Sequence, residues 1–230
     1  MAGSWESERS RLTIAYNLSG ALEAVKKSAL IVVVDVISMS TTLEAVTEAG
    51  AVGIWGACPS PKASGNTLVN PFRIGQLAAR EAKNKGAEVV IITEPRVGSC
   101  EERKANAADV IRGVENEGLP VGEIWPNLGA ETAKFTHWHN KVAVAVTDAG
   151  GVIYDAVYQL GGMITTATVA RTLGMKGVEP ALKGVERAIA MAKKSPITLV
   201  AASSNALEDV LAVHYLAQLF IARGYCQFMD

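Results

Sequence analysis

Short runs of apolar residues alternate with segments of helical periodicity along nearly the whole chain. A continuous apolar run such as Ile31–Val34 predicts a strand buried on both faces, as in a parallel sheet, whereas apolar residues at helical spacing predict amphipathic helices. The expected strands are 12–16, 31–34, 52–57, 88–93, 141–147, 162–165 and 197–201. The expected helices are 19–27, 43–49, 73–85, 105–116, 152–160, 167–173, 178–194 and 206–223. Turn-forming residues predict irregular structure at 58–72, 94–101 and 118–127.

This alternation predicts an α/β fold. Helices that connect successive parallel strands cover both faces of their sheet, so we expect a three-layer α/β/α architecture with a mostly parallel sheet. The sequence has no linker long enough to force two independent domains, and we expect one domain over residues 1–230. Two sublobes, if present, would divide near 118–140.

Composition narrows the class of protein. With 230 residues, 49% of them hydrophobic, the chain can bury a full core. The net charge of −1 and the lack of a dense basic run argue against nucleic-acid binding. The apolar runs are shorter than the roughly 18 residues of a membrane-spanning helix, and the polar N-terminus lacks a signal-peptide core, so we expect a cytoplasmic protein with no membrane partner. The mean hydropathy of +0.20 is explained equally by a homodimer interface and by a large core.

The strand at 31–34 leads directly to a carboxylate and a cluster of hydroxyls. Asp35 lies at the carboxyl end of this strand, where open α/β sheets bind their ligands. Hydroxyls and free N–H groups in the first turn of the next helix can hold an anion, and the carboxylate can carry Mg²⁺. The hydroxyls are Ser38, Ser40, Thr41 and Thr42. Phosphoryl chemistry fits this pattern, but an N-cap cluster beside a strand-end acid explains it equally well.

Two further strand ends carry polar residues that would meet Asp35 at the same edge of a parallel sheet. One leads to Asp148, Gly150 and Gly151, and the other to Glu208 and Asp209. The acids are candidate ligands for a hard cation, and the glycines would let the backbone approach an anion. A simple turn explains the glycines equally well. A capping box for Glu208 and a solvated first-turn acid for Asp209 also remain open.

The segment Asp35–Ala51, with DVISMSTT before a helix and a Gly-Ala pair, resembles the opening motif of the 2-phosphosulfolactate phosphatases, or ComB-like proteins. The segment 207–209 (LED) matches a second motif of that family, and weaker similarity extends over nearly the whole chain. These Mg²⁺-dependent enzymes remove phosphate from 2-phosphosulfolactate in coenzyme M biosynthesis. The resemblance therefore implies a ComB-like α/β fold, a Mg²⁺ cofactor and a small anionic phosphorylated substrate.

The resemblance also implies roles for particular residues. The expected catalytic residues are Asp35, Glu94, Asn106 and Asp148. The expected substrate-binding residues are Ser38, Ser40, Thr41, Thr42, Arg96, Gly150 and Gly151. The expected Mg²⁺ ligands are Asp35, Glu208 and Asp209.

The chain departs from the family pattern at charged and polar positions. Ser38 stands where the family usually has an arginine, Ala201 where it has a cysteine, and Asp148 where it has an asparagine. A guanidinium is the natural partner of a phosphate or sulfonate, so the loss at Ser38 needs a replacement cation. Candidates are Arg96, Arg73, Lys62 and Arg103.

Two other functional classes stay open. A non-hydrolytic relative could keep the fold and bind anions, which would account for the lost family residues. A nucleotide-binding α/β protein is the weaker alternative, because neither GxxxxGK[ST] nor a GxGxxG after a strand occurs in the sequence.

Overall fold

The computed structural model describes residues 11–193 and 195–226, so most of the polar N-terminus considered above, residues 1–10, lies outside the described residues. The described strands form two four-stranded sheets, and their pairings are all parallel. Sheet A has the order β1 (Leu12–Tyr16), β8 (Ile197–Ala201), β2 (Leu30–Val34) and β7 (Met163–Thr166). Sheet B has the order β3 (Gly53–Ala57), β6 (Lys141–Val146), β4 (Glu88–Thr93) and β5 (Val121–Pro126).

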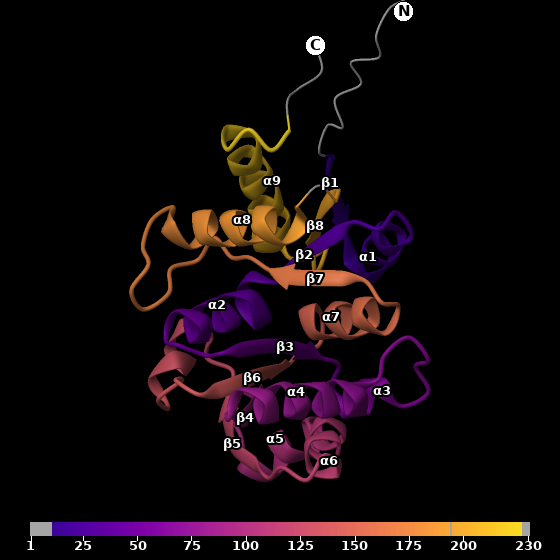
Figure 1. Cartoon of the computed structure of the whole chain (residues 1–230), viewed down its shortest axis with the longest axis vertical. Helices are drawn as coiled ribbons and strands as arrows, with labels where there is room; N and C mark the ends of the chain where they lie inside the picture. The colour runs from indigo at the N-terminus through magenta and orange to yellow at the C-terminus, as the bar shows by residue number, and fades with distance from the viewer. Residues whose placement is uncertain (1–10, 194, 227–230) are drawn as a thin grey trace, which may run out of the picture.

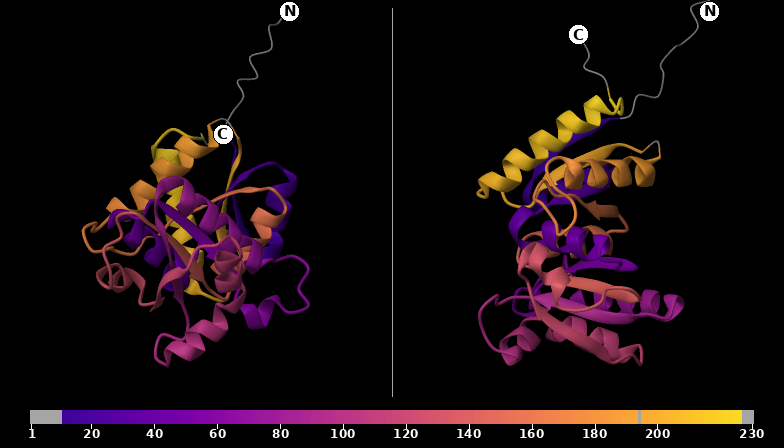
Figure 2. Two further views of the ribbon diagram at one scale, coloured as in Figure 1. Left: turned by 60° about the horizontal axis from the view of Figure 1, so that its bottom comes forward. Right: turned by 90° about the vertical axis from the view of Figure 1, so that its left-hand side faces the viewer.

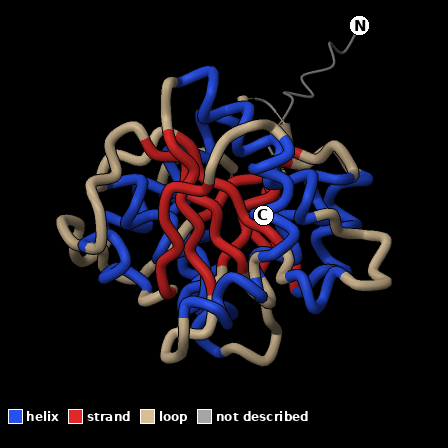
Figure 3. The backbone as a smooth tube through the Cα atoms, turned by 90° about the horizontal axis from the view of Figure 1, so that it is seen from below, coloured by secondary structure: helices blue, strands red, loops and turns tan. Residues whose placement is uncertain are grey.

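Helices flank both sheets and give the three-layer α/β/α arrangement expected from the sequence (Figure 1, Figure 3). They are α1 (Asn17–Lys26), α2 (Thr41–Glu48), α3 (Ser60–Ala63), α4 (Pro71–Lys85), α5 (Cys100–Asn106), α6 (Ala108–Asn116), α7 (Gly150–Gln159), α8 (Glu179–Ala192) and α9 (Leu207–Ala222). A π-helical turn (Val36–Ser40) precedes α2, and a 3₁₀ helix spans Gly129–Lys134. In the described part of the chain, no helix is long and apolar enough to cross a membrane.

The burial of alternate residues explains the continuous apolar runs. In β2, Ile31 and Val33 join a central core that includes residues of both sheets and of α2 and α7. Leu30, Val32 and Val34 face the opposite way, into a core shared with α8 and α9. Successive side chains of a strand point to opposite faces, so a strand between two helical layers must be apolar at every position.

The chain changes sheet twice. It leaves sheet A after β2, through the π-helical turn and α2, and it returns from sheet B after β6, through α7. Sheet B therefore comes from one continuous stretch, which forms the lower half of the right-hand view in Figure 2. Both crossings begin at carboxyl ends of parallel strands, next to Asp35 and Thr147, and open α/β sheets bind ligands where such connections diverge.

Four expectations about local structure are wrong. The segment 58–72 is not irregular throughout, because it contains α3 and the start of α4. The segment 118–127 is not irregular but contains β5, whose terminal Pro126 is tolerated because β5 is an edge strand. The helix expected at 105–116 begins earlier and is divided at Ala107 into α5 and α6. The segment 167–173 is not helical; within it the Thr168 hydroxyl accepts a hydrogen bond from the Ala170 N–H, a local contact that competes with helix formation.

The suggested sublobe division at 118–140 includes β5 and the 3₁₀ helix. The connections between the sheets lie elsewhere, after β2 and before β7.

Candidate functional site

Asp35 lies at the carboxyl end of β2 and is held by backbone donors from both crossings. The Ser38 N–H donates to Asp35 Oδ1 (3.0 Å), and the Gly150 N–H donates to Oδ2 (2.8 Å). The residue is only 4% exposed, and this burial raises the pKa of its carboxyl, although both N–H donors and the Arg96 guanidinium act in the opposite direction. The buried carboxylate therefore joins the start of α7 to the π-helical turn.

The two glycines at the start of α7 allow different close approaches. A Cβ at Gly150 would lie 2.6 Å from Asp35 Oδ2, so a side chain there would displace the carboxylate. A Cβ at Gly151 would lie 2.2 Å from the Ala57 carbonyl oxygen, which is a backbone contact. Gly150 thus belongs to the Asp35 site, whereas Gly151 is required for packing of α7 on β3.

The hydroxyls after Asp35 do not form the expected anion cradle. The Ser40 hydroxyl donates to Val33 O and accepts from the Asp35 N–H and the Thr166 hydroxyl. Thr41 and Thr42 are also buried, with hydroxyls bonded to Val36 O and Asn127 Oδ1. These three side chains stabilise the core. These hydroxyls lie inside the helical segment and not at its start, because the π-helical turn continues into α2. The N-terminal end of the segment is therefore at Val36–Ser38.

The ends of β4 and β5 bring Glu94, Arg96 and Asn127 to the same place. Asn127 is fully buried: it accepts from the Thr42 hydroxyl (2.6 Å) and donates to Ser38 O and to Glu94 Oε1 (3.3 Å). Arg96 donates to Glu94 Oε1 (3.3 Å) and to the Ile37 carbonyl oxygen (3.1 Å). Asn127 was not predicted as a site residue, because it lies at the carboxyl end of β5, a strand that the local sequence pattern does not indicate.

The acids at the start of α9 reach the opposite side of the π-helical turn. Asp209 is 3% exposed and accepts from the Val36 N–H (2.8 Å) and the Ser203 N–H (3.3 Å). Burial, and to a smaller extent the charges of Asp35 and Glu208, raise the pKa of Asp209 to about 6, against the effect of its two N–H donors. The capping-box alternative for Glu208 is wrong, because the N-cap residue of α9 is Ala206 and makes no side-chain cap bond.

The expected Mg²⁺ ligands Asp35, Glu208 and Asp209 do not form a metal cage of their own. Among the described residues, no group of three or more His, Cys, Asp or Glu side chains is arranged to hold a metal. Each carboxylate oxygen of Asp35 and Asp209 accepts one N–H and keeps further acceptor capacity. Mg²⁺ is commonly bound by one or two carboxylates together with water and substrate phosphate, which this arrangement permits.

The remaining sequence candidates lie at the margin of the site. The exposed Asp148 forms an ion pair with Lys62 (3.0 Å), so its negative charge is balanced. Asn106 donates to the Thr93 hydroxyl (2.9 Å) and so fixes the end of β4. Arg73 donates to Gln159 and Arg103 to Pro95 O, whereas Arg96 is the candidate cation whose charge acts on Asp35.

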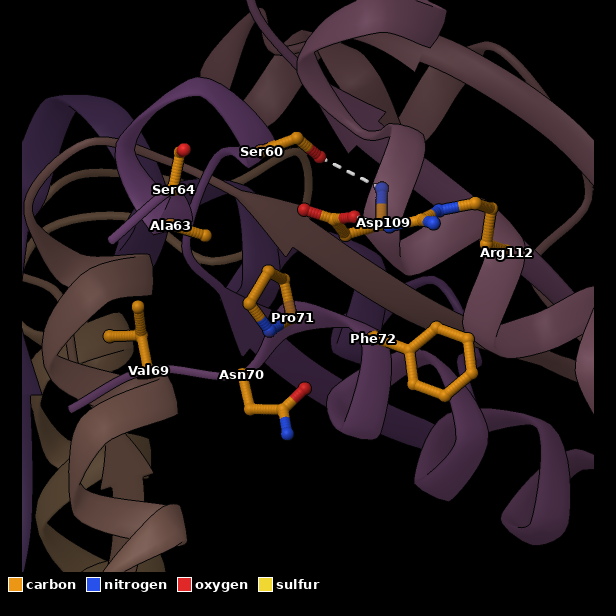
Figure 4. A pocket seen from close by; sticks show the side chains of 9 residues that line it. All are labelled: Ser60, Ala63, Ser64, Val69, Asn70, Pro71, Phe72, Asp109 and Arg112. Atoms are coloured by element: carbon orange, nitrogen blue, oxygen red, sulfur yellow. Dashed lines mark hydrogen bonds and ion pairs between the residues drawn. The ribbon is translucent and has the colours of Figure 1, made fainter. Parts of the chain in front are cut away.

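A separate pocket of about 410 Å³ lies between α3 and the N-termini of α4 and α6 (Figure 4). Ser60 accepts from the Asp109 N–H at its wall, and Phe72 and Arg112 also line it. Its lining includes none of the candidate residues described above. The candidate site is placed at Asp35 because carboxylates, a guanidinium and the N–H donors of the connections that follow β2 and β6 converge there.

Comparison of this chain with models of protein families, with curated proteins and with solved structures gave no match.

Proposed function

We propose that the protein is a Mg²⁺-dependent phosphatase that hydrolyses the phosphate monoester of a small anionic hydroxy acid, of the kind that 2-phosphosulfolactate represents. The observation that carries this proposal is the position of Asp35. This buried carboxylate lies where the chain crosses between the sheets, is fixed by the Ser38 and Gly150 N–H groups, and is influenced by Arg96. The sequence motif at Asp35–Ala51 supports the same chemistry.

The roles follow from the contacts. Asp35 and Asp209 would hold Mg²⁺ together with the substrate phosphate, without Glu208 as a third ligand, and the ion when bound neutralises phosphate charge and activates water. Arg96 has a planar guanidinium that can bind two oxygens of a phosphate or carboxylate. Glu94 orients Arg96 through their ion pair, and Asn127 in turn fixes Glu94. We further propose that the protein acts in coenzyme M biosynthesis, in the cytoplasm and as a homodimer.

The test is release of inorganic phosphate from 2-phosphosulfolactate and a panel of phosphorylated hydroxy acids, with Mg²⁺ or with a chelator. We expect Asp35→Asn to abolish release and Arg96→Gln to lower kcat/KM about 100-fold, as loss of a charge-stabilising donor does elsewhere. Arg73→Gln is the matched control, because Arg73 bonds Gln159 away from Asp35. Undiminished release by Asp35→Asn would refute the proposal.

A second candidate function is anion binding without hydrolysis. The departures from the family pattern at Ser38 and Ala201 favour it, because they remove a guanidinium and a thiol that the family's phosphatases have. Calorimetric titration with the same esters distinguishes the two functions. Binding without phosphate release, in folded protein with Mg²⁺, would favour the second.

A further inference from the structure

Four of the segments close to Asp35 carry an exposed apolar side chain. Ile37 lies in the π-helical turn, Val97 follows Arg96, Leu128 follows Asn127, and Leu207 precedes Glu208. Their exposed fractions are 49%, 93%, 40% and 66%, respectively. We call these four residues the apolar rim.

Hydrogen bonds bring the segments of the apolar rim together around one turn. Arg96 donates to Ile37 O (3.1 Å), and Asn127 donates to Ser38 O. On the other side, Val36 donates to Asp209 Oδ1 (2.8 Å). Single exposed apolar residues are ordinary on a protein surface, but apolar residues on adjoining segments around a polar site are typical of ligand sites.

The charges at the site oppose a strongly anionic organic group. Arg96 is paired with Glu94, and Lys62 with Asp148. Asp209 and Glu208 add further negative charge close to Asp35. A bound Mg²⁺ could balance the phosphate, and Arg96 could exchange Glu94 for the carboxylate of the substrate, but a sulfonate in addition would face Asp209 and Glu208 with no cation of its own.

We infer that the substrate is a phosphorylated 2-hydroxy acid with an apolar side chain in the position where sulfolactate has its sulfonate. This inference rests on the proposed function for the phosphate position. The apolar rim contacts the side chain of the substrate, while its phosphate and carboxylate lie toward Asp35 and Arg96. Burial of apolar surface against the rim then favours the larger side chains.

The test uses phosphate esters that share the phosphate and carboxylate and differ in one substituent. The series is the esters of lactate, 2-hydroxyisocaproate and phenyllactate, with 2-phosphosulfolactate as the sulfonated member. Calorimetry with Mg²⁺ measures their affinities, and phosphate release is measured separately. We expect the phosphate ester of 2-hydroxyisocaproate, which has an isobutyl side chain, to bind about tenfold more tightly than that of lactate, which has a methyl side chain. The sulfonated ester should bind most weakly.

Calorimetry tests the inference about the side chain of the substrate, and phosphate release tests the proposed hydrolysis. Tightest binding of 2-phosphosulfolactate, or equal affinities across the series, would overturn the inference even if all esters were hydrolysed. The expected ranking without phosphate release would support the inference about the side chain and refute hydrolysis.

Variants of the apolar rim give a second test. Ile37→Ser and Leu207→Ser should each reduce several-fold the preference in affinity for the phosphate ester of 2-hydroxyisocaproate over that of lactate. The matched control is Leu160→Ser, because Leu160 is 54% exposed but follows the far end of α7, about 15 Å along that helix from Gly150. Equal preferences in Ile37→Ser and Leu160→Ser would refute a contact between the rim and the substrate.

Discussion

The closest backbone approach in the site makes Gly150→Ala a sharp test of the Asp35 geometry. The added Cβ would lie 2.6 Å from Asp35 Oδ2, 2.9 Å from Asp35 Cβ and 2.9 Å from Met39 Cε. Asp35 and Met39 are both buried, so neither can move freely. The carboxylate must therefore leave its position or the start of α7 must shift, and either movement breaks the 2.8 Å bond from the Gly150 N–H.

The expected magnitude combines three effects. Loss of a hydrogen bond to a charged acceptor costs about 1.5–3 kcal/mol, and overpacking a core contact costs about 1–3 kcal/mol. Replacing a helical glycine by alanine returns about 0.5–1 kcal/mol. We expect a net loss of about 2–4 kcal/mol, or roughly 4–16 °C in melting temperature for a chain of this size, together with loss of phosphate release.

Gly122→Ala is the matched control for thermal unfolding and phosphate release. The nearest heavy atoms to a Cβ at Gly122, on β5, are 3.3 Å away, so we expect a change within about 1 kcal/mol. If Gly150→Ala proved as stable and as active as Gly122→Ala, the Asp35–Gly150 contact would not be part of the native site.

Three further predictions concern the surroundings of the site. Asn127→Asp should lower kcat about tenfold or more and shift the pH optimum of kcat, because it removes the amide donors to Ser38 O and Glu94 and adds an acid beside Glu94. The control is Asn116→Asp, on an exposed face of α6, and equal pH profiles of the two variants would contradict the role of Asn127. Glu44→Gln should destabilise the protein by about 3–5 kcal/mol in urea unfolding, because the 2% exposed Glu44 is paired with Arg187, and the double replacement Glu44→Leu/Arg187→Met should recover part of that loss. The pKa of Asp209 rises from its ordinary value of 3.8 to about 6 on folding, so the contribution of Asp209 to stability is greatest below pH 3.8 and is lost as the pH rises through 6. With chelator present, the melting temperature of the unmutated protein should therefore fall relative to that of Asp209→Asn between about pH 4 and 6. Parallel curves of melting temperature against pH would refute the raised pKa.

The strands with buried faces could be predicted because their signal is local. The ranges 88–93 and 197–201 agree with the structure because a run of apolar residues between turn signals reflects burial on both faces. The division into two sheets was not predictable in this way. The register that pairs Leu12 with Ile197 depends on contacts between opposite ends of the chain, which no local pattern records.

The candidate site shows the same limit at the scale of single bonds. Asp35 could be identified from its place after an apolar run. The orientation of the following hydroxyls depends instead on the bond from the Ser40 N–H to the Asp35 carbonyl oxygen (2.7 Å), five residues apart, which widens the turn. Helical spacing alone would have kept those hydroxyls near the ligand, and it gave no signal for the contact between Asn127 and Ser38 O.

The order of strands in sheet A constrains how the protein can be made. β8 lies between β1 and β2, yet it leaves the ribosome after the other described strands, whereas the strands of sheet B emerge one after another. During synthesis the N-terminal strand must wait with an unpaired edge until the final quarter of the chain arrives, and such edges invite aggregation. Loss of the C-terminal segment would therefore remove the strand that joins the first two, and with it the last acids to arrive at Asp35.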